Sequence, residues 1–332
     1  MMQEVLVIGG AGYIGSHAVA TLVDEGYQVV VVDNLSTGHR QAVHPSATFY
    51  ECDLRDKAVL TEIFKAHHFD GVFHFAAYSL VGESVYKPLE YFNNNVYGMQ
   101  ILLEVMVEIG VDKLIFSSSA AVYGEVPMEY ITEETQPRPA SPYGETKLIM
   151  EEMIHWCTKA YDLRYVSLRY FNVAGARRDG SIGEDHQPET HLVPIILQTA
   201  LGQREKLVIF GDDYATPDGT CIRDYVHVDD LIDAHVQAFH YLESHSDSQI
   251  FNLGSSRGYS VKEMWQAAEA VTGKDIPAEI GERRAGDPAR LVAESSKARQ
   301  VLRWEPKYDE VQPIIETAWQ WHQRHPNGYR DK

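Results

Sequence analysis

Short apolar runs alternate with helix-like stretches through the first half of the chain. The runs cover residues 5–8, 29–32, 47–52, 71–75, 113–117 and 165–170, and the helix-like stretches cover residues 12–25, 57–67, 89–109 and 142–160. Short strands that are almost entirely apolar, separated by helices, are typical of a parallel sheet that is buried on both faces. The pattern therefore predicts a doubly wound α/β fold with a parallel Rossmann-type sheet.

This alternation ends near residue 174. Residues 176–191 are polar and rich in glycine and proline, as in a loop, and the chain beyond them mixes short helices and strands without a repeat. Asp229 and Asp230 are suited to the cap and first turn of a helix that reaches about residue 241. We predict a Rossmann domain over residues 1–174, completed by parts of 222–254, and a smaller mixed α/β domain over residues 175–332.

Charge and cysteine content restrict the partners and the compartment. The 29 basic and 48 acidic residues leave a net charge of −19, which disfavours nucleic acid and anionic membranes as partners. The start of the chain lacks a basic segment before its apolar residues, and no apolar run approaches the roughly 18 residues of a membrane span. The three cysteines, Cys52, Cys157 and Cys221, are odd in number and far apart, which favours free thiols. We therefore expect a cytoplasmic protein.

Glycines at a regular spacing follow the first predicted strand. Gly9, Gly12 and Gly15 lie directly between that strand and a helix, where missing β-carbons let the backbone approach a pyrophosphate. Asp33 ends the second strand, 18 residues after Gly15, where a carboxylate accepts from both ribose hydroxyls and repels a 2′-phosphate. A plain strand-to-helix turn and an ordinary strand-end acid are the alternatives. Together the residues predict a site for NAD rather than NADP.

A second constellation combines a serine with a tyrosine and a lysine on one helix face. Ser141 is a plausible cap and Pro142 a favourable first residue, so Tyr143 and Lys147 fall at positions i and i+4. A nearby ammonium, together with a positive nicotinamide ring, favours the phenolate and makes Tyr143 a candidate general acid or base. Ser119, just past the fifth strand, is expected at the carboxyl edge of the sheet. Such a tyrosine–lysine spacing also occurs by chance in many helices.

The 15 histidines invite a search for a metal site. Neither the neighbours His67 and His68 nor the pairs His235/His240 and His322/His325 come with a ligand set, and no HExxH motif occurs. We therefore expect no metal site.

A family resemblance emerges from the motifs taken together. GGAGYIGSH, DNLSTG, FAAYSLVGESVYKPLEYFNNNVYG, FSSSAAVYG, SPYGETK, RYFNVAGA, DGTCIRDYVHVDD and RRAGDPA follow one another along essentially the whole chain. In this set the chain resembles the UDP-glucose 4-epimerases, which are extended short-chain dehydrogenases/reductases. Single motifs occur throughout that superfamily, whereas the complete set is specific.

The resemblance implies a role for each matching residue. It implies that NAD is bound by Gly9, Gly12, Tyr13, Ile14, Gly15, Asp33, Asn34, Leu35, Ser36, Thr37, Gly38, Asp53, Leu54, Phe75, Ala76, Ala77, Ser79, Asn94, Ser119, Tyr143, Lys147 and Phe171. It implies that the UDP-sugar is bound by Ser119, Tyr143, Asn172, His191, Leu192, Arg223, Arg284, Asp287 and Leu291. Two arginines in an acidic chain suit a diphosphate. Many members have lysine in place of Ser79 and asparagine in place of His191, and some have tyrosine in place of Leu291.

The activity implied is the inversion of C4 of the hexose in UDP-glucose and UDP-galactose, an isomerase reaction of galactose metabolism with Tyr143, Lys147 and Ser119 as catalytic residues. The resemblance also implies a homodimer. UDP-N-acetylhexosamines, a uronic acid or a pentose are alternative sugars, and a non-catalytic NAD-sensing module is an alternative from another class. A dehydratase or decarboxylase would need an acid directly after the catalytic serine, where this chain has Ala120 and Ala121.

Overall fold

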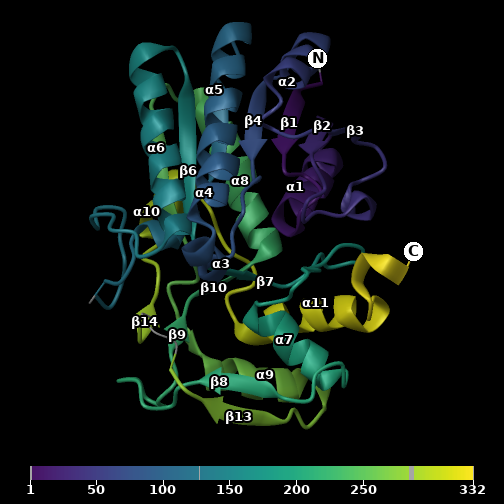
Figure 1. The fold of residues 1–332 in the computed structure, drawn as a ribbon, viewed down its shortest axis with the longest axis vertical. Helices are drawn as coiled ribbons and strands as arrows, with labels where there is room; N and C mark the ends of the chain where they lie inside the picture. The colour runs from purple at the N-terminus through teal and green to yellow at the C-terminus, as the bar shows by residue number, and fades with distance from the viewer. Residues whose placement is uncertain (1, 127, 284–287, 332) are drawn as a thin grey trace.

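A seven-stranded parallel sheet forms the centre of the larger part of the protein (Figure 1). The structure is a computed structural model that describes residues 2–126, 128–283 and 288–331. The strands lie in the order β11–β6–β5–β4–β1–β2–β3. Their bounds are β1 Glu4–Ile8, β2 Gln28–Asp33, β3 Thr48–Glu51, β4 Gly71–His74, β5 Lys113–Ser117, β6 Arg164–Tyr170 and β11 Gln249–Leu253. The predicted doubly wound α/β fold is confirmed.

Helices cover both faces of this sheet, as the apolar strands require. Val5 and Val7 of β1 pack in the core on the side of α1 (Tyr13–Asp24) and α8 (Val228–Ser244). Leu6 and Ile8 point the other way, into the core formed with α2 (Lys57–Ala66), α5 (Gly98–Ile109) and α6 (Pro142–Ala160). Successive residues of a strand face opposite sides, so both sets must be apolar.

The helix expected over residues 89–109 is divided into three pieces. It comprises α4 (Pro88–Tyr91), a π-helical turn over Phe92–Tyr97 and α5, and it follows the short helix α3 (Val81–Tyr86). Within the π turn the buried Asn95 donates to the Tyr78 carbonyl at 3.1 Å and to Thr146 Oγ1 at 3.0 Å. A π turn changes the direction of the side chains after it, and such turns occur often at functional sites.

A smaller, mixed region lies below the sheet in Figure 1. Its strands are β7 (Asn172–Ala174) beside β10 (Tyr225–His227), β8 (Leu207–Phe210) beside β13 (Ala278–Gly281), and β9 (Ile222–Arg223) between β12 (Tyr259–Ser260) and β14 (Arg290–Leu291). Its helices are α7 (Leu192–Ala200), α9 (Val261–Thr272) and α11 (Val311–Arg324), which share one apolar core, while α10 (Ser296–Val301) packs near β11. Short 3-10 turns lie at Arg40–Ala42, Ala120–Val122 and Gly328–Asp331. Among the described residues, no helix has the length and apolar character needed to cross a membrane.

Candidate active site

The loop between β1 and α1, together with the first turn of α1, leaves no room for a β-carbon at Gly9 or Gly15. Gly9 has a φ of +79°, and a β-carbon there would lie 2.6 Å from the Ala76 backbone nitrogen. A β-carbon on Gly15 would lie 2.1 Å from the Gly9 carbonyl oxygen. At Gly12, which caps α1 without a side-chain hydrogen bond, the nearest atom would be 3.5 Å away. The loop is therefore packed closely against the rest of the protein at Gly9 and Gly15, and it has space at Gly12, at the N-terminus of α1.

Asp33 supports this loop at the end of β2. Its Oδ2 accepts a 2.9 Å hydrogen bond from the Ala11 amide, and its Oδ1 accepts one of 2.8 Å from the Leu35 amide. Burial raises the pKa of the carboxyl, and these two amides oppose the shift. Leu35, in the left-handed region at φ +56°, begins the turn that contains Ser36, Thr37 and Gly38.

The neighbouring predicted residues form a connected group beside Asp33. Asn34 donates to Asp53 at 2.9 Å, and Arg55 binds the same carboxylate through both Nε and Nη2. The Arg55 guanidinium therefore holds the pKa of Asp53 well below its usual range. Leu54 packs against Gly98. Phe75, Ala76 and Ala77 follow β4, Ser79 precedes α3, and Asn94 lies in the π turn, donating to Asn95 Oδ1 at 3.0 Å.

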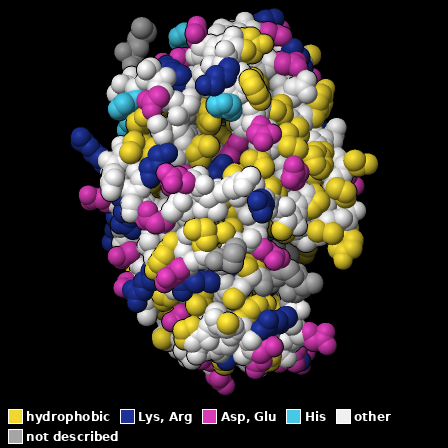
Figure 2. All heavy atoms as spheres, turned by 90° about the vertical axis from the view of Figure 1, so that its left-hand side faces the viewer, with side chains coloured by type: hydrophobic (Ala, Val, Ile, Leu, Met, Phe, Trp, Pro, Cys, Tyr) yellow, Lys and Arg dark blue, Asp and Glu magenta, His cyan; other side chains and the backbone are white. Residues whose placement is uncertain are grey.

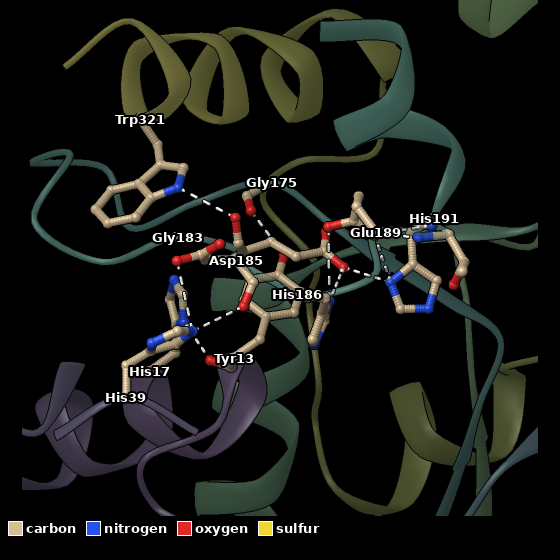
Figure 3. A network of polar contacts seen from close by, with 12 residues as sticks. Tyr13, His17, His39, Gly175, Gly183, Asp185, His186, Glu189, His191 and Trp321 are labelled. Atoms are coloured by element: carbon tan, nitrogen blue, oxygen red, sulfur yellow. Dashed lines mark hydrogen bonds and ion pairs between the residues drawn. The ribbon is translucent and has the colours of Figure 1, made fainter. Parts of the chain in front are cut away.

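Tyr13, one of the residues expected to bind NAD, also makes a hydrogen bond to a distant part of the chain. The side chain of Tyr13, the first residue of α1, is directed to the smaller region, where its hydroxyl donates to the Gly175 carbonyl at 2.6 Å (Figure 3). Ile14 follows it in the first turn of α1.

Ser119, Tyr143 and Lys147 meet at the carboxyl end of the sheet. Tyr143 is 9% exposed and interacts with the Ser119 hydroxyl, which itself accepts from the Ala121 amide at 3.1 Å. Lys147 Nζ donates to the Ser117 carbonyl at 2.8 Å and lies 6.0 Å from the centre of the Tyr143 ring. The predicted cap is present, because Ser141 Oγ accepts from the Gly144 amide at 3.2 Å. The helix therefore begins where the sequence predicts and brings the three residues together.

Burial dominates the proton affinities in this group. It lowers the pKa of Lys147 to about 7, because the ammonium has lost its water and the nearby Glu151 compensates only in part. It raises the pKa of Tyr143, and the contact with Ser119 offsets part of that rise. Ser119 and Lys147 therefore do not by themselves make Tyr143 a phenolate. The remaining positive charge that we expect to favour the phenolate is that of the nicotinamide ring.

The residues assigned to the sugar nucleotide come from several short elements. Phe171 and Leu291 pack against the same apolar cluster of Val122, Tyr123 and Ile131, which adjoins Ser119. Arg223 lies opposite Leu291 in the β9–β14 pair, and Asn172 opposite Tyr225 in the β7–β10 pair. Arg284 and Asp287 fall outside the described residues.

His191 is engaged in a way that the sequence analysis missed. It caps α7, which begins at Leu192, and its Nδ1 lies 2.5 Å from Glu184 Oε1. His186 and Glu189 complete a group of four with these two residues (Figure 3). Residues 184–191 have the spacing Glu-x-His-x-x-Glu-x-His, which is the signal in the sequence that indicates this group.

Comparison with known proteins decides the family. The sequence model described as the NAD dependent epimerase/dehydratase family matches residues 5–254. The chain belongs to this family. A UDP-glucose 4-epimerase of Lacticaseibacillus casei is 56% identical over 331 residues, which cover 99% of this chain and 100% of that protein. The resemblance inferred from the motifs is thus confirmed.

Two solved structures of the family have the same fold. A crystal structure of a UDP-glucose 4-epimerase is 60% identical, covers 99% of this chain and 100% of its own, and has a TM-score of 0.97. The UDP-glucose 4-epimerase of Brucella ovis, solved in complex with NAD, is 46% identical over 96% of this chain and 97% of its own, with a TM-score of 0.93.

The residues of this family member fit its cofactor, NAD. The β1–α1 loop offers an open, uncapped helix N-terminus, which suits a pyrophosphate. Asp33 keeps a carboxylate at the end of β2 beside that loop, where it suits a ribose diol without a 2′-phosphate.

Adding a single methyl group at Gly15 tests this loop. The Gly15→Ala variant should lose about 1–3 kcal/mol of unfolding free energy, because its β-carbon would overlap a backbone oxygen that cannot easily move. The matched Gly12→Ala variant should lose less than about 1 kcal/mol, since its β-carbon would lie at an ordinary van der Waals distance, 3.5 Å, from the Gly9 carbonyl oxygen. Urea unfolding of the nucleotide-free proteins gives both values.

NAD extracted from the folded proteins provides the second measurement. Gly12→Ala should fold normally and retain less NAD, because its methyl group would occupy the side from which a pyrophosphate approaches. Equal unfolding free energies for the two variants would contradict this account of the loop.

Proposed function

We propose that this chain is a UDP-glucose 4-epimerase that interconverts UDP-glucose and UDP-galactose through a 4-keto sugar. The observation that carries the proposal is the meeting of Ser119, Tyr143 and Lys147 at the sheet edge that also holds the glycine loop. Ala120 and Ala121 follow Ser119 directly, so the extra acid–base group of a dehydratase is missing at these two positions. The isomerase reaction needs no such group.

Tyr143 is the acid–base group of this mechanism. NAD, when bound, supplies the hydride acceptor that later returns the hydride to C4. Tyr143 takes the proton of the C4 hydroxyl, assisted by Ser119, and gives it back when the hydride returns to the opposite face. Lys147, held by the Ser117 carbonyl, would contact the nicotinamide ribose when NAD is bound, and its Nζ lies 6.0 Å from the centre of the Tyr143 ring.

Inversion requires the sugar to turn while the nucleotide stays bound. We assign the phosphates to Arg223 and Arg284, the uridine ribose to Asp287, and the surroundings of the diphosphate to Asn172, His191 and Leu192. Residues 1–174 with parts of 222–254 hold NAD in this proposal, and residues 175–332 mainly bind the UDP-sugar. All three cysteines are free thiols, which supports a cytoplasmic location.

Incubating the purified protein with UDP-galactose, without added NAD, tests the function. We expect UDP-glucose to form and NAD to be released on acid extraction, since the cofactor undergoes no net oxidation and must stay bound over many turnovers. Failure to form any 4-epimer, or activity only with added NADP, would contradict the proposal.

An apolar surface over α3, α4 and α6 supports the proposed homodimer. Figure 2 shows hydrophobic side chains gathered on the right-hand side of the view. Val85, Tyr86, Leu89 and Trp156 are each at least half exposed, although each is large and apolar. Exposed patches of this kind mark protein interfaces.

Light scattering at micromolar concentration should give twice the mass of the chain. Leu89→Asp, which places a charge in this surface, should shift the protein toward the monomer. Ile280→Asp is the matched control, because Ile280 is also exposed but lies on β13, far along the chain from α4. A monomeric wild type, or equal behaviour of both variants, would refute the dimer.

Leu291 sets our prediction on sugar specificity. The residue packs with Phe171 against the cluster beside Ser119, so its size affects the space near the sugar. Leucine leaves more room than tyrosine for a 2-acetamido group, and we therefore expect UDP-N-acetylhexosamines to be accepted as well. Leu291→Tyr should reduce kcat/KM for UDP-N-acetylgalactosamine relative to UDP-galactose by about 10–200-fold. An unchanged ratio, or a wild type that rejects the acetylated sugar, would refute this prediction.

A further inference from the structure

The loop that leads into α7 brings four side chains of metal-ligand type together. Glu184, His186, Glu189 and His191 each offer one nitrogen or oxygen atom, and these atoms lie within 4.8 Å of one another. His186 and His191 both contact Glu184 Oε1, and Figure 3 shows the two imidazoles beside Glu189. The two imidazoles approach each other edge to face, with ring centres 5.2 Å apart.

The two carboxylates of this group are deeply buried. The side chains of Glu184 and Glu189 are only 4% and 3% exposed. Burying even one unpaired carboxylate costs free energy. Glu189 Oε1 accepts from the amides of Thr190 and His191. Among the described residues, the contacts of the Glu184 carboxylate are with the two imidazoles.

One ring nitrogen in the group is buried without a good hydrogen bond. His186 Nδ1 lies 3.2 Å from Glu184 Oε1 and 3.7 Å from Glu189 Oε2, and neither contact has hydrogen-bond geometry. A buried ring nitrogen that faces two carboxylates at ion-pair distance, without hydrogen-bond geometry to either, requires an explanation, and a bound cation would supply one.

We propose that Glu184, His186, Glu189 and His191 bind one divalent first-row transition-metal ion, through the two imidazole Nδ1 atoms and one oxygen of each carboxylate. Imidazole and carboxylate together suit zinc and related ions, whereas magnesium and calcium prefer oxygen ligands alone. The two carboxylates raise the pKa of both imidazoles and so favour their protonated forms. A divalent cation would displace these protons, and with neutral imidazoles it would neutralise the charge of −2 on the four ligands.

The observed separations are compatible with a four-coordinate site. Metal–ligand bonds near 2.0–2.1 Å in a tetrahedron place the ligand atoms roughly 3.3 Å apart. His186 Nδ1 lies 3.2 Å from Glu184 Oε1 and 3.7 Å from Glu189 Oε2, whereas His191 Nδ1 lies 3.7 Å from Glu189 Oε1. A site with one oxygen of each carboxylate therefore requires the Glu189 carboxylate to turn. His191 and Glu184, now 2.5 Å apart, would have to separate slightly.

The position of the group gives the ion a structural role. The Glu184 carbonyl accepts from Trp321 of α11 at 3.2 Å, and the His186 ring meets the Tyr13 ring of α1 edge to face. An ion at this point would join His191, the cap residue of α7, to both of these helices. A cavity of about 510 Å³, lined in part by Glu184, His186 and Glu189, offers a route for the ion.

Calorimetric titration of chelator-treated protein with Zn²⁺ tests the site directly. We expect one ion to bind per wild-type chain, and this binding to be lost in Glu184→Gln and in His186→Gln. His68→Gln is the matched control, because His68 is an exposed histidine outside the group, and it should bind as the wild type does. Absence of one-equivalent binding, or binding that the ligand variants leave unchanged, would overturn the proposal.

Two further measurements cover the case that a variant folds poorly. Circular dichroism compares the folding of each variant with that of the control. Co²⁺ added to the wild type should give the intense visible absorption of a four-coordinate ion, and the weak absorption of a six-coordinate aqua ion would also overturn the proposal. Neither measurement uses a UDP-sugar, so their failure would leave the epimerase function untouched.

Discussion

Replacing Tyr143 by phenylalanine is expected to reduce kcat for epimerisation by ~10²–10⁴-fold, the usual contribution of a general acid–base group. The change removes the hydroxyl that interacts with Ser119 and leaves the ring in its buried position. Folding and NAD content should therefore persist, and the loss should appear in kcat for both UDP-glucose and UDP-galactose.

Ser119→Ala provides the comparison for this variant. Ser119 assists Tyr143 and does not itself take up the proton in our mechanism, so its removal should slow turnover less. Steady-state rates, with NAD content measured for each variant, separate lost chemistry from lost cofactor. Near-normal epimerisation by Tyr143→Phe would show that another group moves the proton.

Glu151→Gln is expected to lower the free energy of unfolding by about 3–5 kcal/mol, the usual loss when one partner of a buried ion pair is removed. Glu151 and Arg169 are each 4% exposed and form a hydrogen-bonded ion pair. Ser167 also donates to Glu151, and Arg169 donates to Tyr123. Glutamine would leave the guanidinium buried without a counter-charge.

Glu152→Gln is the matched control for this prediction, because Glu152 is the adjacent, exposed glutamate of the same helix. It should change the unfolding free energy by no more than about 0.5 kcal/mol. Denaturant titration of both variants gives the comparison, and similar values for the two would contradict the role of the ion pair. In Glu151→Gln the pKa of Lys147 should also fall further, because Glu151 now raises it.

The sheet was predictable because its signal is local. Strands buried on both faces must be apolar at every position, and the six predicted runs match β1 to β6 closely. The seventh strand, β11, follows a break in the alternation, and only its pairing with β6 makes it part of the sheet. The π turn within residues 89–109 was not predicted, because no periodic pattern in the sequence marks it. What accompanies it is the tertiary contacts of Asn95 with Tyr78 and Thr146.

The sequence by itself determined the dinucleotide loop and the spacing of Tyr143 and Lys147, since tight turns and helix faces depend on neighbouring residues. Only the tertiary structure decided the proton affinities and the partners. Burial depends on what packs around a group, so the lowered pKa of Lys147 and the raised pKa of Tyr143 appear only in the fold. The same holds for the meeting of Glu184, His186, Glu189 and His191, because a loop brings side chains together only when the surrounding helices fix its path.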